Sequence, residues 1–71
     1  TFTAGERYLI IADGYARRGN TAEALGAIRA GLRFAPNDLA LKVGLANALV
    51  DHAGMLTPAA RLAYEQARAA R

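Results

Sequence analysis

Apolar residues recur every three or four positions in four stretches of this chain, and groups of polar, Gly or Pro residues separate the stretches. This spacing gathers the apolar side chains on one face of a helix. In the first stretch the face consists of Tyr8, Ile11, Ala12 and Tyr15. We therefore expect four helices of about 12–15 residues, with short connections that make consecutive helices antiparallel.

The first helix should begin near Thr3 and end at Gly19. Thr3 and Glu6 have the spacing of a capping box, in which each side chain satisfies a free backbone amide of the other residue. At the other end, Arg17 and Arg18 place positive charge in the last turn, and Gly19 has the position of a C-terminal cap.

The second helix should begin at Asn20 or Thr21, and Asn20 again has capping-box spacing with Glu23. Pro36 ends it, so residues 34–35 are expected to leave helical geometry already. Its apolar face consists of Ala24, Leu25, Ile28, Gly31 and Leu32.

The third helix is predicted to follow Asn37 and Asp38, which supply a cap and an acidic first turn. Residues 51–54 interrupt the pattern, and Thr57 before Pro58 restarts it, because Pro suits the first position of a helix. The apolar faces are Leu41, Leu45, Ala48 and Leu49 in the third helix, and Ala60, Ala63, Tyr64 and Ala67 in the fourth.

The first helix pair resembles a tetratricopeptide repeat, whose pattern sets large and small residues at fixed distances. The matching residues are Tyr8, Ile11, Ala12, Tyr15, Ala24, Ile28, Gly31 and Pro36. Small residues at Ala12, Ala24 and Gly31 let two helices approach closely, while the larger side chains fill the space beside them.

A shift of 34 residues reveals a weaker second copy. Lys42 stands where the pattern has a large aromatic residue, and the second turn is two residues longer than the first. The resemblance implies an all-α domain over residues 1–71. Its repeats, at about 5–38 and 39–71, would be two antiparallel helix-turn-helix pairs stacked as a short right-handed superhelix. An unrelated four-helix bundle with the same spacing is the alternative.

Composition and charge argue against several functions. The net charge is +3, and acidic residues are interspersed with the arginines, so no dense basic run favours nucleic acid. The chain has no Cys or Ser, and its one histidine, His52, lies in a predicted loop, so we expect neither an enzyme nor a metal or cofactor site. No apolar run approaches the roughly 18–20 residues that span a bilayer, so no membrane insertion is expected. Without an initiator Met, the chain is expected to be a soluble piece of a longer protein.

The resemblance implies that a protein or peptide partner binds in a concave groove, which the first helix of each pair lines. The groove positions are Glu6, Leu9, Ile10, Asp13 and Arg17 in the first helix, and Val43, Gly44, Asn47 and Asp51 in the third. Leu9, Ile10 and Val43 are apolar and lie off the core face, so they are candidate partner anchors; packing within the fold is the alternative. A structural or self-assembly role is the alternative function.

One subtype of the family binds a terminal carboxylate of a chaperone tail with a clamp of Lys, Asn and Arg. Asn47 has the residue type of such a clamp, but Leu9, Ile10 and Gly44 occupy its other positions. We therefore expect an apolar or mixed ligand.

The two ends of the chain differ from its middle. Leu25 and Leu32 should meet Leu41 and Ala48 in a buried seam between the pairs. The equivalent positions at the outer ends are charged and should be exposed; they are Arg7, Arg61 and Arg68. Such ends suit terminal repeats and disfavour a long array. A homodimer remains compatible, because the Ala-rich last helix presents some apolar surface, including Leu62.

Overall fold

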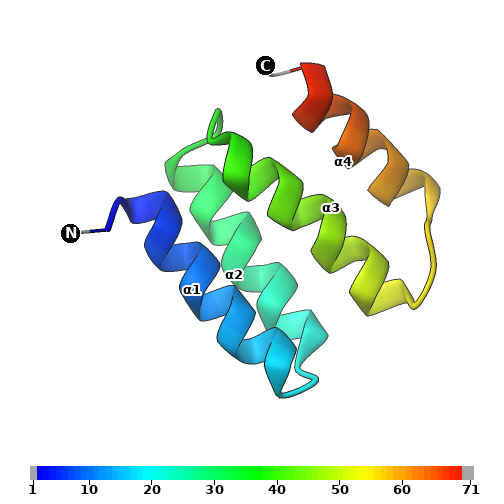
Figure 1. Cartoon of the computed structure of the whole chain (residues 1–71), viewed down its shortest axis with the longest axis horizontal. Helices are drawn as coiled ribbons and strands as arrows, with labels where there is room; N and C mark the ends of the chain where they lie inside the picture. The colour runs from blue at the N-terminus through cyan, green and yellow to red at the C-terminus, as the bar shows by residue number, and fades with distance from the viewer. Residues whose placement is uncertain (1, 70–71) are drawn as a thin grey trace.

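Four helices occur in the computed structural model, which describes residues 2–69 of the chain. They are α1 (Ala4–Arg17), α2 (Thr21–Phe34), α3 (Leu39–Ala53) and α4 (Pro58–Ala69). Successive helices reverse direction, so α1 with α2 and α3 with α4 form two antiparallel pairs (Figure 1). No strand is present within residues 2–69, and the predicted all-α class is confirmed.

The two pairs stack through α2 and α3 into a flat body with extents of 34 × 31 × 15 Å. Each helix packs on its partner within the pair, α2 packs on α3, and α1 also contacts α3. The first helices of the two pairs therefore lie next to each other, with α2 packed against both.

All four helices begin at the residues that the sequence indicates, and three of these starts have a side-chain cap. At α1, the amide of Glu6 donates to Oγ1 of Thr3 (3.1 Å) and the amide of Thr3 donates to Oε1 of Glu6 (3.3 Å), so the capping box is confirmed. Asp38 caps α3 and Thr57 caps α4, each accepting from the amide three residues later. Pro58 is the first residue of α4, as expected.

The capping box predicted for Asn20 and Glu23 is wrong, because Asn20 is used to close the preceding helix. Gly19 adopts a left-handed conformation with φ +80°. This allows its amide to donate to the carbonyl of Ala16 (3.0 Å), and the amide of Asn20 to donate to that of Tyr15 (2.9 Å). With its amide already bonded and its backbone away from the extended region, Asn20 makes no side-chain cap.

The helices α2 and α3 are longer than predicted. Nothing between Asp51 and Ala53 prevents helical geometry, so α3 continues to Gly54, where a left-handed residue (φ +72°) ends it. His52 therefore lies in the last turn of α3 and not in a loop, and its Nδ1 hydrogen-bonds to Oγ1 of Thr21 (2.9 Å). Likewise, α2 continues through Phe34, one residue beyond the prediction.

Small residues form the closest contacts within each pair. The buried positions at equivalent places in the two halves are Ala12 and Ala46, Ala24 and Ala60, and Gly31 and Ala67. Short side chains at these positions allow the helix backbones to approach closely. The two halves thus repeat one packing arrangement, although the second match is weak in sequence.

Ile11 was predicted to belong to the core, and the structure shows that this is wrong: its side chain is 50% exposed. Leu45, which is 34 residues further on, is half-buried against the core. The difference arises because α2 covers that side of α3, whereas no helix among the described residues covers the outer side of α1.

The seam between the pairs is largely as predicted. Leu41 is fully buried, Leu25 and Ala48 are nearly so, and Leu32 is half-buried. The three predicted outer positions, Arg7, Arg61 and Arg68, are all exposed. Apolar burial therefore holds the pairs together at the seam, and charged side chains lie in solvent at both outer ends.

Candidate binding groove

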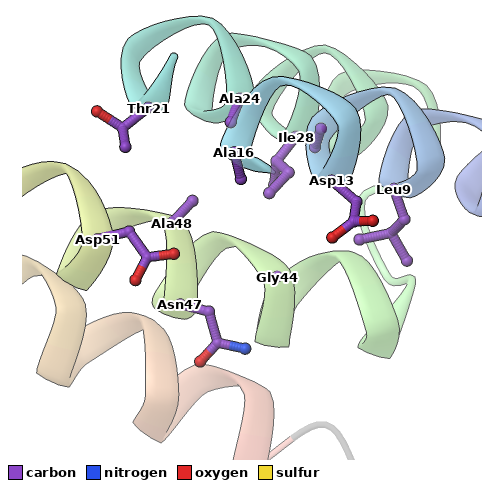
Figure 2. A pocket seen from close by; sticks show the side chains of 11 residues that line it. Leu9, Asp13, Ala16, Thr21, Ala24, Ile28, Gly44, Asn47, Ala48 and Asp51 are labelled. Carbon is purple, nitrogen blue, oxygen red and sulfur yellow. The ribbon is translucent and has the colours of Figure 1, made fainter. Parts of the chain in front are cut away.

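A cavity of about 160 Å³ lies between α1 and α3, with α2 behind it (Figure 2). Its floor is apolar and its rim is polar. The buried floor residues are Ala12, Ala24, Ile28 and Ala48. The polar rim residues are Asp13 from α1, Thr21 from α2, and Asn47 and Asp51 from α3.

The cavity exists because alanines line it where larger residues would fill the space. At its end, Gly44 brings α3 close to α1: a β-carbon on Gly44 would lie 2.9 Å from Cδ2 of Leu9 and 3.4 Å from Cδ1 of Ile28. Leu9 is half-buried in this contact and also borders the cavity. It therefore packs between the helices as well as facing the groove.

The structure brings together five of the nine residues that the sequence places on the groove. These are Leu9, Asp13, Gly44, Asn47 and Asp51. They come from α1 and α3, the two helices from which they were expected.

The other four positions, Glu6, Ile10, Arg17 and Val43, do not line the cavity. Glu6 caps the start of α1. Ile10 and Val43 are 53% and 40% exposed on the same two helices. Their contact with a partner stays a prediction.

Arg17 lies beside the groove and pairs with Asp13. The distance from its Nε to Oδ2 of Asp13 is 2.9 Å, and the two residues are one helical turn apart on α1. Both side chains are largely exposed, so water screens the pair and it contributes little to stability. A ligand could therefore replace Arg17 at this carboxylate at small cost.

Asn47 is held by a residue of α4 that the sequence did not point to. The hydroxyl of Tyr64 donates to Oδ1 of Asn47 at 2.6 Å. No hydrogen bond of the Asn47 amide nitrogen occurs with residues 2–69, so this nitrogen can donate to a ligand. The two residues are 17 positions apart on different helices, and no local pattern indicates this contact.

Thr21 was also missed as a rim residue. Its helix begins beside the end of α3, and its hydroxyl bonds to His52 there. From the sequence we expected Thr21 only to start a helix. Its neighbour across the groove, His52, belongs to the second helix pair, and local spacing does not indicate contacts between the two pairs.

The described surface also has hollows elsewhere. One of about 320 Å³ lies at the outer side of α1 against Phe34, and one of about 250 Å³ lies beside the turn before α4. Both are larger than the groove between α1 and α3. We favour that groove because helices from both pairs build it and its floor is buried.

Residues 2–69 contain no group of three or more His, Asp or Glu side chains placed to hold a metal ion. Within the same range, no helix is long and apolar enough to cross a membrane. Comparison of the chain with protein-family models, curated proteins and solved structures finds no match. Function is therefore inferred from the groove and from the internal repeat.

Proposed function

We propose that this chain is a protein-interaction module of the tetratricopeptide type, which binds a peptide or a helix of a partner between α1 and α3. The observation that carries the proposal is the groove itself. Its apolar floor would exclude water from a ligand side chain, and its polar rim would orient the ligand backbone.

The repeated packing supports the choice of family. Residues that correspond in the two halves, such as Ala12 with Ala46 and Ala24 with Ala60, are buried alike. An unrelated bundle has no reason to bury small residues at matching places in both halves. The spacing in the sequence and the burial in the structure therefore favour the same repeat.

The size of the groove favours a peptide over a small molecule. Its volume of about 160 Å³ lies below the roughly 300–1,000 Å³ of small-molecule sites. A space of this size accommodates one or two side chains. A longer segment that lies along α1 and α3 would make its remaining contacts on the exposed parts of these helices, where Ile10 and Val43 lie.

A peptide selection with a blocking variant tests this proposal. Peptides of about 12 residues selected from a random display library would be titrated into the ¹⁵N-labelled protein. We expect amide shifts at Asp13, Asn47 and Asp51. Ala16→Phe, at an exposed position that borders the groove, should abolish binding.

Ala22→Phe is the matched control, since Ala22 is exposed on α2 outside the groove. It should leave binding unchanged. Selected peptides that shift only other surfaces, or that bind Ala16→Phe as tightly as the wild type, would refute the groove.

Self-assembly is the second candidate, and the outer side of α1 favours it. Phe34 is 70% exposed and Ile11 is 50% exposed, and both border the hollow of about 320 Å³. Sedimentation at rising concentration would then show dimers. Phe34→Ser should remove the dimers, whereas Leu62→Ser on α4 should not. A monomer at every concentration would exclude this role.

A further inference from the structure

Two carboxylates face the groove from opposite walls. Asp13 projects from α1 and Asp51 from α3, towards the space between the helices (Figure 2). They are the charged residues among those that line the cavity, and no Arg or Lys lines it. The chain as a whole carries a net charge of +3. The groove is therefore acidic on a protein that is otherwise basic.

The position of Asp51 is not explained by its own helix. It lies near the C-terminus of α3, where the helix dipole disfavours negative charge. Asp51 has no ion pair with the residues that the structure describes. Asp51 is exposed and hydrated, and a cationic ligand beside it would offset its unfavourable interaction with the helix dipole.

Asp13 is paired within the protein but can exchange its partner. Its side chain is 61% exposed, and that of Arg17 is 79% exposed. A ligand cation could take the place of Arg17 and would leave the arginine solvated. Asn47, on the same wall as Asp51, offers its amide nitrogen to a carbonyl oxygen of a bound backbone.

We propose that the ligand of this groove is a basic peptide segment, with an Arg or Lys side chain between Asp13 and Asp51. The alkyl part of that side chain would cover the alanine floor, and its charged end would reach the rim carboxylates. An acidic segment would be repelled by the same two groups. This inference rests on the proposed groove function and adds the charge of the partner to it.

Three synthetic heptapeptide pools test the charge of the ligand. Each pool is acetylated and amidated, has mixed Ala, Leu and Gln at the outer positions, and carries Arg, Gln or Glu at the centre. Titration into the ¹⁵N-labelled protein, followed at the amides of Asn47 and Asp51, gives a midpoint for each pool. The Arg pool should half-saturate at about twofold to fivefold lower concentration than the Gln pool, the range for exposed ion pairs. The Glu pool should bind most weakly.

Two variants that each remove one negative charge separate an effect of the groove carboxylate from an effect of the net charge of the protein. Asp51→Asn should bring the Arg and Gln midpoints closer together, because it removes one of the two carboxylates. Glu65→Gln, on α4 outside this groove, should keep the wild-type preference. High salt should also reduce the preference for Arg, because it screens exposed charges.

The outcomes distinguish the two proposals. If the Gln pool shifts the groove amides but the Arg pool binds no tighter, the basic ligand is refuted and the groove function stands. If the preference for the Arg pool survives Asp51→Asn but is lost in Glu65→Gln, the proposal of a basic ligand is also refuted. If no pool shifts the groove amides, both proposals fail.

Discussion

Gly31 of α2 faces Tyr8 of α1 so closely that a β-carbon on Gly31 would lie 2.9 Å from Cβ of Tyr8. Leu41 approaches the same place from α3, and its Cδ1 would lie 3.1 Å from the added carbon. Gly31 therefore marks the point where three helices meet. Because Cβ of Tyr8 is fixed to its backbone, a larger residue at Gly31 would push α1 and α2 apart.

Gly31→Ala should lower the free energy of unfolding by up to about 3 kcal/mol. Overpacking costs roughly 1–3 kcal/mol, and the better helix propensity of Ala recovers up to about 1 kcal/mol. Urea denaturation followed by circular dichroism measures the difference.

Gly26 supplies the control on the same helix, because an added β-carbon there meets nothing within 4 Å. Gly26→Ala should gain about 0.5–1 kcal/mol from propensity alone. Equal effects of the two substitutions would show that α1 and α2 are not in close contact at Gly31.

Leu25 and Arg61 occupy equivalent places in α2 and α4, yet only Leu25 is buried. Leu25→Ala should cost about 2–5 kcal/mol, because it leaves a cavity in the seam between the pairs. Arg61→Ala should change stability by no more than about 0.5 kcal/mol. Thermal unfolding of both variants would show this, and a large loss with Arg61→Ala would mean that a further surface covers α4.

Gly5 and Asp38 couple the start of α1 to the start of α3. A β-carbon on Gly5 would overlap the carboxylate of Asp38, which caps α3 by accepting from the amide of Leu41 (3.0 Å). Gly5→Ala should displace this carboxylate and lose much of the capping energy, about 0.5–2 kcal/mol.

A double-mutant cycle tests this coupling. Once Asp38→Ala has removed the cap, Gly5→Ala should cost less than it does in the wild type. Additive losses would mean that the two residues do not act on each other.

Asp51→Asn should make the free protein more stable, by about 0.3–1 kcal/mol at low ionic strength, because a carboxylate near the C-terminus of α3 opposes the helix dipole. The gain should shrink with salt. Glu65→Gln removes the same charge from the middle of α4 and should have a smaller effect. Destabilisation by Asp51→Asn would show that Asp51 serves the fold and weaken its assignment to ligand binding.

Much of the fold can be predicted from local patterns along the chain. Capping residues such as Thr3, Asp38 and Thr57 locate helix starts, because a cap needs only a side chain and an amide three residues away. The same reasoning failed at Asn20, whose amide is bonded to the preceding helix. A spacing alone does not show which partner a backbone group already has.

The candidate site was predictable only in part. The positions of Asp13, Asn47 and Asp51 on the first helix of each pair place them on one face, and the structure brings them to one cavity. The bond from Tyr64 to Asn47 and the rim position of Thr21 were missed. Both depend on the distance between helices that lie far apart in the chain.

Local spacing thus determines which residues form helices and which face of each helix is apolar, because both depend on neighbours within one or two turns. It does not determine what covers that face. Ile11 and Leu45 hold equivalent places, yet Leu45 packs against α2 and Ile11 is exposed, since α1 has no described neighbour on its outer side. The groove has the same origin, because a cavity appears only where α1, α2 and α3 meet and their alanines leave space unfilled.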